Sequence, residues 1–307
     1  MSGALTLRFT TQAQIDIRRM TNELSDLQRQ VASGAVANDL RGFGGAASRM
    51  LNASTLKASA DARGSVINQL QARFGVQGAA LGQVASATSL LSQSIREAIS
   101  ANDGRGIATE LDLSFSSIIS ALNETWNGQP MFAGERQGQG PIRINSLDQL
   151  QAATGPDAIF DEASRHQTVD FGSGAPVVLA AKASELSQGV FDTLRLLADF
   201  LDSHGGTIGQ PISAAQQTQL QQVADALDVE AAKFTNEEGR AGQLQSRFEA
   251  ERARLQQRSN LLLQEIGDQA DADIATVSVK LSSLLAQYQA AAKTFAELSG
   301  LSLLDYL

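Results

Sequence analysis

Residues 271–298 read DADIATVSVKLSSLLAQYQAAAKTFAEL, and this stretch decides the fold class. Its apolar side chains recur at alternating steps of three and four, which puts them on one face of a helix. We name these positions the C-terminal seam: Ile274, Val277, Leu281, Leu284, Tyr288, Ala291, Phe295 and Leu298. The stripe is as narrow as a coiled-coil seam, so we expect this helix to pair with another helix.

A second seam lies near the other end of the chain, between residues 14 and 31. This N-terminal seam has the same spacing and comprises Ile17, Met20, Leu24, Leu27 and Val31. Burying each large apolar side chain is worth about 1.5–3 kcal/mol, which a lone helix in water does not gain. We therefore expect the two seams to pack on each other and to leave surface for other chains. Both seams, with Leu303 and Leu304, form the predicted assembly interface.

Helical patterns also fill much of the region between the seams. A second long helix is expected over about 46–100, with an apolar stripe of the same spacing from Ile67 to Ile95 in which Gln77 and Thr88 are the polar members. A third helix is expected over 107–126, and further helices over 190–202 and 213–234. Gly75, Gly78 and Gly82 weaken the second helix, so they are interpreted as points of close helix approach. A further apolar stripe continues from Leu244 to Ile266, and residues 267–273 are interpreted as a joint whose carboxylates favour the next helix's N-terminus.

Residues 134–189 differ, because glycines and prolines interrupt them and only short runs such as Val177–Leu179 look extended. Three parts are therefore predicted: a terminal coiled-coil domain (1–45 with 267–307), a helical core domain (46–133 with 190–266) and an inserted domain (134–189). The predicted fold class is mainly α, with long antiparallel helices, paired terminal helices and a small irregular or β insert.

Composition argues against several classes of protein. With 24 basic and 33 acidic residues and a net charge of −9, the chain lacks the basic surface that nucleic-acid backbones require. It contains no cysteine, which removes disulfides and thiol chemistry. The first residues lack the apolar core of a signal peptide, and no apolar run approaches the ~20 residues of a membrane span. We expect no membrane insertion and export without a cleaved signal.

Few residues suggest chemistry. His166 and His204 have no partner at metal-ligand spacing. Asp268, Asp271 and Asp273 resemble a calcium loop only faintly, since Val279 takes the place of its final glutamate. They are interpreted as helix caps, so no metal and no cofactor are expected.

Two further motifs have ordinary structural explanations. Residues 42–45, Gly-Phe-Gly-Gly, follow a helix and lack the Lys-Ser/Thr of a phosphate loop, which favours a hinge. Glu237 and Glu238, beside Gly239 and Arg240, are interpreted as an exposed corner between helices. The sequence predicts no catalytic residue and no enzyme.

Several short motifs, taken in order, resemble one family. They are Leu7 to Gln12, Ser94 to Ala98 followed by Asn102, Met131-Phe132-Ala133-Gly134, residues 271–274, and the closing LSLLDYL of residues 301–307. Together they are similar to the bacterial flagellin family, and Met131 to Gly134 is most like its hook-filament junction proteins. The chain departs from the junction proteins at residues 38–43, which lack their Asp-Asp-Pro.

The resemblance implies a structural, extracellular flagellar subunit exported through the type III apparatus. Implied partners are further copies in a ring or filament, a hook-side junction protein, flagellin and an export chaperone. The alternatives are a flagellin that builds the filament itself, or, in another class, a surface adhesin or glycan-binding protein that uses the insert. The N-terminus lacks the Asn-Thr-Asn of flagellins, which favours the junction.

Overall fold

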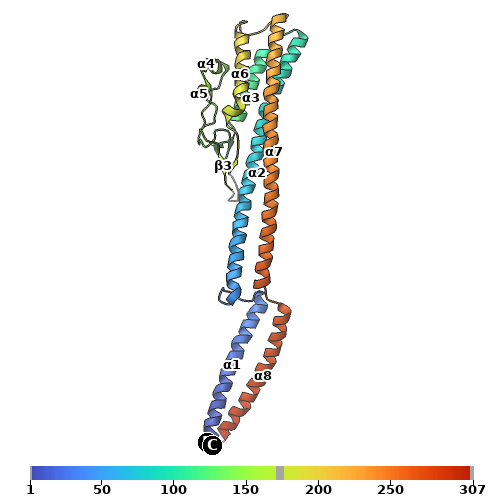
Figure 1. Ribbon diagram of the computed structural model, residues 1–307. Coiled ribbons are helices and arrows are strands. Elements are labelled where there is room, and N and C mark those ends of the chain that lie inside the picture. The colour runs from blue at the N-terminus through green and yellow to red at the C-terminus, as the bar shows by residue number, and fades with distance from the viewer. Residues whose placement is uncertain (1, 171–175, 305–307) are drawn as a thin grey trace. The chain divides into compact units, whose positions relative to one another are not determined.

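The computed structural model describes the backbone of residues 2–170 and 176–304 and the side chains of residues 11–170 and 176–297. Long helices make up most of it, as predicted (Figure 1). They are α1 (Ser2–Ser33), α2 (Ala47–Ala101), α3 (Ile107–Leu122), α6 (Ala183–Asp202), α7 (Ala214–Ala270) and α8 (Ile274–Leu304). The mainly α fold class is confirmed.

Shorter elements connect them. A 3-10 turn, η1 (Gly44–Ala46), precedes α2. Residues 134–189, which we continue to call the insert, contain α4 (Leu147–Ala152) and α5 (Pro156–Ile159). Two antiparallel hairpins are formed by β1 (Thr125–Trp126) with β2 (Gln129–Pro130) and by β3 (Thr168–Val169) with β4 (Val177–Val178).

The chain divides into two compact units, one of Met1–Ala62 with Leu255–Leu307 and the other of Arg63–Arg254. We call them the terminal unit and the central unit. Helices α2 and α7 contribute residues to both. The finer three-part division expected from the sequence stays a prediction.

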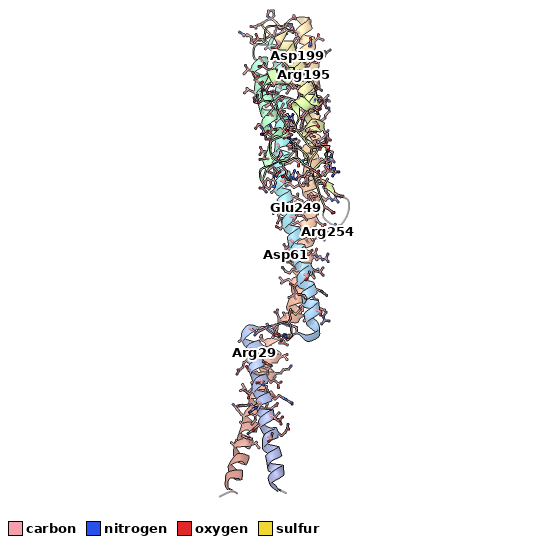
Figure 2. The ribbon with its side chains drawn as sticks, turned by 90° about the vertical axis from the view of Figure 1, so that its left-hand side faces the viewer. Arg29, Asp61, Arg195, Asp199, Glu249 and Arg254 are labelled. Carbon is pink, nitrogen blue, oxygen red and sulfur yellow. The ribbon has the colours of Figure 1, made fainter. Side chains whose placement is uncertain are left out.

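In the central unit α2 and α7 run antiparallel and bury the stripe of α2. Phe74 of α2 stacks on Phe248 of α7 with ring centroids 5.5 Å apart. Further along, the Ser92 hydroxyl donates to the Ala224 carbonyl at 3.0 Å. The stripe positions are all buried, including the two polar ones: Ile67, Leu70, Phe74, Gln77, Leu81, Val84, Thr88, Leu91 and Ile95. Charged side chains such as Arg254 lie on the outer surface of the helices (Figure 2).

The predicted helix break around Glu237 is wrong. Helix α7 is continuous from Ala214 to Ala270 and passes through Gly239 and Arg240. Buried Phe234, Ala241 and Phe248 recur every seven residues across this stretch, so packing against the core outweighs the weak helix propensity of one glycine. The same helix also passes Gly267, so the joint before α8 is only residues 271–273.

The glycines of α2 were mostly misinterpreted. A Cβ added at Gly75 or Gly78 would meet open space, so neither marks a close approach. Only Gly82 faces a neighbour, because an added Cβ would lie 3.2 Å from the Glu238 carboxylate of α7. Here the glycine leaves room for a charged side chain.

The third helix ends earlier than predicted, at Leu122. Asn127 and Gly128 both have positive φ, 50° and 75°. An Asn-Gly pair with this geometry makes a tight hairpin turn, and it joins β1 to β2 with Trp126 opposite Gln129. The dipeptide is a hairpin signal and not simply the end of a helix.

The motif Met131 to Gly134 lies where the insert begins. Met131, Phe132 and Ala133 are buried. The Phe132 carbonyl accepts from the amide of Ala183 at 2.8 Å, and the Ala133 carbonyl accepts from the amide of Ala163 at 2.9 Å. Backbone hydrogen bonds therefore attach this motif both to the loop around Ala163 and to the start of α6. Helix α6 begins at Ala183, earlier than the predicted residue 190 and within the predicted insert.

Gly134→Ala should destabilise the central unit more than Gly128→Ala. Both glycines have positive φ, 64° and 75°, so each substitution strains the backbone. Only at Gly134 would the new Cβ lie 2.3 Å from a backbone atom, the Arg165 carbonyl oxygen, whereas Gly128 faces open space. In urea unfolding we expect Gly134→Ala to lose at least about 1 kcal/mol more than Gly128→Ala. Equal losses of stability in the two variants would show that the backbone around Arg165 moves away from the new Cβ at little cost in free energy.

Candidate assembly interface

Helices α1 and α8 of the terminal unit lie side by side (Figure 1) and bring the two predicted seams together. Leu24, Leu27 and Val277 are buried, and Ile274, at the start of α8, is exposed. The half-buried seam residues are Ile17, Met20, Val31, Leu281, Leu284, Tyr288, Ala291 and Phe295. The side chains of Leu298, Leu303 and Leu304 lie outside those that the structure describes.

The terminal pair therefore covers its seam only partly. In the central unit Val84, Leu91 and Ile95 of α2 are 0% exposed, because several helices close over them. A pair of helices without further neighbours leaves the edges of the side chains at its interface exposed to water. Most described seam side chains of α1 and α8 thus keep apolar area in contact with water.

Sequence reasoning missed apolar side chains outside the seams. Ile15 of α1 is 49% exposed, and Val279 and Leu285 of α8 are 69% and 37% exposed. Ile15 and Val279 stand off the three-and-four spacing, so periodicity gave no signal for them, whereas Leu285, four residues after Leu281 and three before Tyr288, borders the seam. Their apolar character at exposed positions adds to the area that the terminal pair offers to a partner.

Of the three aspartates interpreted as helix caps, Asp273 caps the start of α8, whereas Asp268 lies within α7. One oxygen of Asp273 accepts from the amides of Ala275 and Thr276 at 3.1 and 3.2 Å, and the other accepts from the Thr276 hydroxyl at 2.7 Å. The hydroxyl and amide of Thr276 and the amide of Ala275 hold the pKa of Asp273 below its ordinary value. The cap therefore stabilises α8 above the unfolded pKa of about 4 and is lost as the pH falls through the lower folded value.

The end of α1 and the start of α8 are joined by an isolated antiparallel β-bridge between Ala35 and Asp271. The Val36 amide donates to the Ala270 carbonyl at 2.8 Å, and the Ala272 amide donates to the Gly34 carbonyl at 2.8 Å. Gly34 has a φ of 71°, which favours glycine at this helix end. A single β-bridge is too short to produce an alternation of apolar and polar residues, so the sequence did not predict it.

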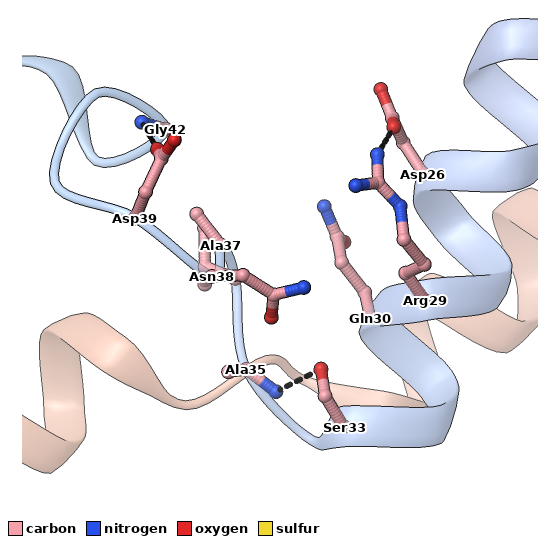
Figure 3. Close-up of a pocket in the computed structure, with 10 residues that line it drawn as sticks. Asp26, Arg29, Gln30, Ser33, Ala35, Ala37, Asn38, Asp39 and Gly42 are labelled. Carbon is pink, nitrogen blue, oxygen red and sulfur yellow. Dashed lines mark hydrogen bonds and ion pairs between the residues drawn. The ribbon is translucent and has the colours of Figure 1, made fainter.

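A polar cavity of about 370 Å³ lies between the last turns of α1 and the loop that follows (Figure 3). Arg29 pairs with Asp26 on the same helix, and the Asp39 carboxylate accepts from the Gly42 amide at 3.0 Å. Arg29 and Asp26 neutralise each other, and the bond from the Gly42 amide to Asp39 closes the turn that precedes η1. The predicted hinge segment thus contains an ordinary tight turn.

The two histidines are placed by local contacts. His166 Nε2 lies 2.8 Å from Glu185 Oε2, and His204 packs on Phe200 with its Nδ1 2.8 Å from the Phe200 carbonyl oxygen. Among the described residues, no group of three His, Cys, Asp or Glu side chains could hold a metal ion. Within the same residues no helix is long and apolar enough to cross a membrane.

The chain resembles flagellar proteins in sequence and in fold. Residues 224–307 match the family model of the bacterial flagellin C-terminal helical region. FlgL from Bacillus cereus is 13% identical with a TM-score of 0.51, over 66% of this chain and 98% of that one. A Vibrio parahaemolyticus protein assigned as a flagellar hook-associated protein is 17% identical with a TM-score of 0.56, over 73% and 96%. No curated protein matches by sequence. The resemblance expected from the residues is confirmed.

Proposed function

We propose that this chain is a structural subunit of the flagellum at the junction of hook and filament. The match of residues 224–307 to the helical region that ends bacterial flagellins supports this proposal. The observation that carries the proposal is the half-covered seam between α1 and α8. Each square ångström of apolar surface removed from water contributes about 25 cal/mol, so neighbouring subunits that cover the seam would stabilise an assembly.

The assembly interface consists of the two seams, continued through Leu298, Leu303 and Leu304. Neighbouring copies in a ring or filament would cover the exposed parts of the half-buried seam side chains. Its other partners would be flagellin on one side, a hook-side junction protein on the other, and an export chaperone before assembly. The subunit would act outside the cell, without catalysis and without a cleaved signal.

Two features favour the junction over a filament-forming flagellin. One is the motif Met131 to Gly134, which is anchored by backbone bonds where the insert begins. The other is the fold, which is that of solved proteins described as FlgL and as a hook-associated protein. An adhesin function would need a binding site in the insert, and none of the motifs points to one.

Self-assembly separates junction from filament. A filament subunit must bind copies of itself along the axis without limit, whereas a junction subunit meets a different protein on at least one side. We expect the purified protein at micromolar concentration to stay monomeric or to form short oligomers when seeds of sheared flagella are added. Flagellin from the same cells is the control, and it should elongate the seeds. Long filaments grown from this protein alone would contradict the junction and support the flagellin alternative.

A further inference from the structure

The seams of α1 and α8 do not by themselves fix how the two helices align. Their apolar positions repeat every seven residues, so a slip of seven residues would place one apolar set against another. A buried polar side chain often sets the register in coiled coils. Among the described seam residues only Tyr288 carries a polar group, and it is half-buried.

The β-bridge beside the pair can supply the missing alignment. Its two backbone bonds, between Val36 and Ala270 and between Ala272 and Gly34, are both 2.8 Å long. Backbone bonds of this kind define one register, because a shift by one residue would turn the paired side chains to the opposite face.

The bridge is also tied closely to both helices. Helix α1 ends at Ser33, and the Ser33 hydroxyl accepts from the Ala35 amide at 3.2 Å. The Gly34 amide donates to the Gln30 carbonyl at 2.8 Å. On the other side the Asp271 amide donates to the Gly267 carbonyl and the Val277 amide to that of Asp273, each at 2.8 Å. Little free chain remains between the bridge and either helix.

We propose that residues 34–36 and 270–272 form a register clamp that sets the alignment of α1 against α8. The seam holds the two helices together, and the clamp selects which of the equivalent alignments they adopt. The clamp thereby decides which apolar side chains the terminal pair presents. This inference concerns the isolated chain and does not rest on the flagellar function.

The first test traps the clamp with a disulfide, which is unambiguous because the chain has no cysteine of its own. Ala35 and Asp271 form the non-hydrogen-bonded type of antiparallel pair, whose Cα atoms are typically about 4.5 Å apart, within the range of a disulfide. Ala35→Cys/Asp271→Cys should oxidise nearly completely in the purified monomer. The control Ala35→Cys/Ala272→Cys should not, because its side chains point to opposite faces. Equal oxidation of both pairs would overturn the clamp.

The second test asks whether the clamp controls the helices. Spin labels at Arg18→Cys and Gln287→Cys, both exposed, report one separation of α1 from α8. Val36→Pro and Ala272→Pro each remove one clamp hydrogen bond. Either variant should add a second population, displaced by about 10 Å along the helix for a slip of seven residues. The control is Asn38→Pro, which lies in the same loop. Within the described residues the Asn38 amide donates no backbone hydrogen bond, so this variant should keep one population.

The remaining outcomes decide against the proposal. An unchanged single separation in both clamp variants would mean that the seam alone sets the alignment. Complete separation of α1 from α8 would mean that the bridge holds the pair together, which contradicts a clamp that only selects its register.

Discussion

Leu284→Asp will abolish incorporation of the subunit into the assembly while leaving the central unit folded. Leu284 is a half-buried seam residue of α8, and the proposed neighbours would bury the rest of it. An unpaired polar group enclosed there costs at least about 2 kcal/mol, and an ionised carboxylate costs more. Since about 1.4 kcal/mol is a factor of ten, association should weaken at least twentyfold at each interface.

The measurement compares the amounts of subunit recovered with sheared flagella and free in the medium. Gln287→Asp is the matched control, because it adds the same charge at an exposed position one turn further along α8. Thermal unfolding of the central unit should be the same for both variants and the unmodified chain. Normal incorporation of Leu284→Asp would mean that this seam faces no partner.

Phe191→Ala will cost the central unit about 3–5 kcal/mol, the largest loss of stability that we expect from a single substitution. Phe191 of α6 is 0% exposed. Its ring meets Phe115 of α3 edge-on at 6.3 Å and Phe160, just after α5, at 5.7 Å. The ring therefore joins a core helix to the insert, and its removal leaves a cavity that neither neighbour can fill.

Urea denaturation followed by circular dichroism measures this loss. Leu196→Ala is the control on the same helix, because Leu196 is 50% exposed and its truncation should change the stability by less than about 0.5 kcal/mol. If the two variants unfolded at the same urea concentration, the contacts of Phe191 with Phe115 and Phe160 would contribute nothing to the stability of the central unit.

Helical periodicity in the sequence correctly predicted which faces of the long helices are buried. The stripe from Ile67 to Ile95 is buried throughout, and the polar residues Gln77 and Thr88 are buried with it, because a seven-residue pattern fixes one helix face whatever occupies single positions. The pairing of α1 with α8 followed from the same argument. Such patterns are local in sequence, so a single chain suffices to recognise them.

Features that depend on distant segments were missed. Gly239 looked like a helix end because its propensity is poor, but Phe234 and Phe248 pack into a core that sequence spacing alone does not reveal. The bridge of Ala35 with Asp271 joins residues from opposite ends of the chain through backbone atoms. A backbone hydrogen bond does not depend on which side chains are present, so the pattern of side chains could not predict it.

The pairing of α1 with α8 also determines the order in which the chain can fold. Nearly the whole sequence separates these two helices, so their contacts are among the most non-local in the molecule, and contacts of this kind form late. The first helix leaves the ribosome long before the last one exists. Throughout synthesis its apolar stripe has no partner within the chain, and a helper protein that binds such a stripe has that whole interval in which to act.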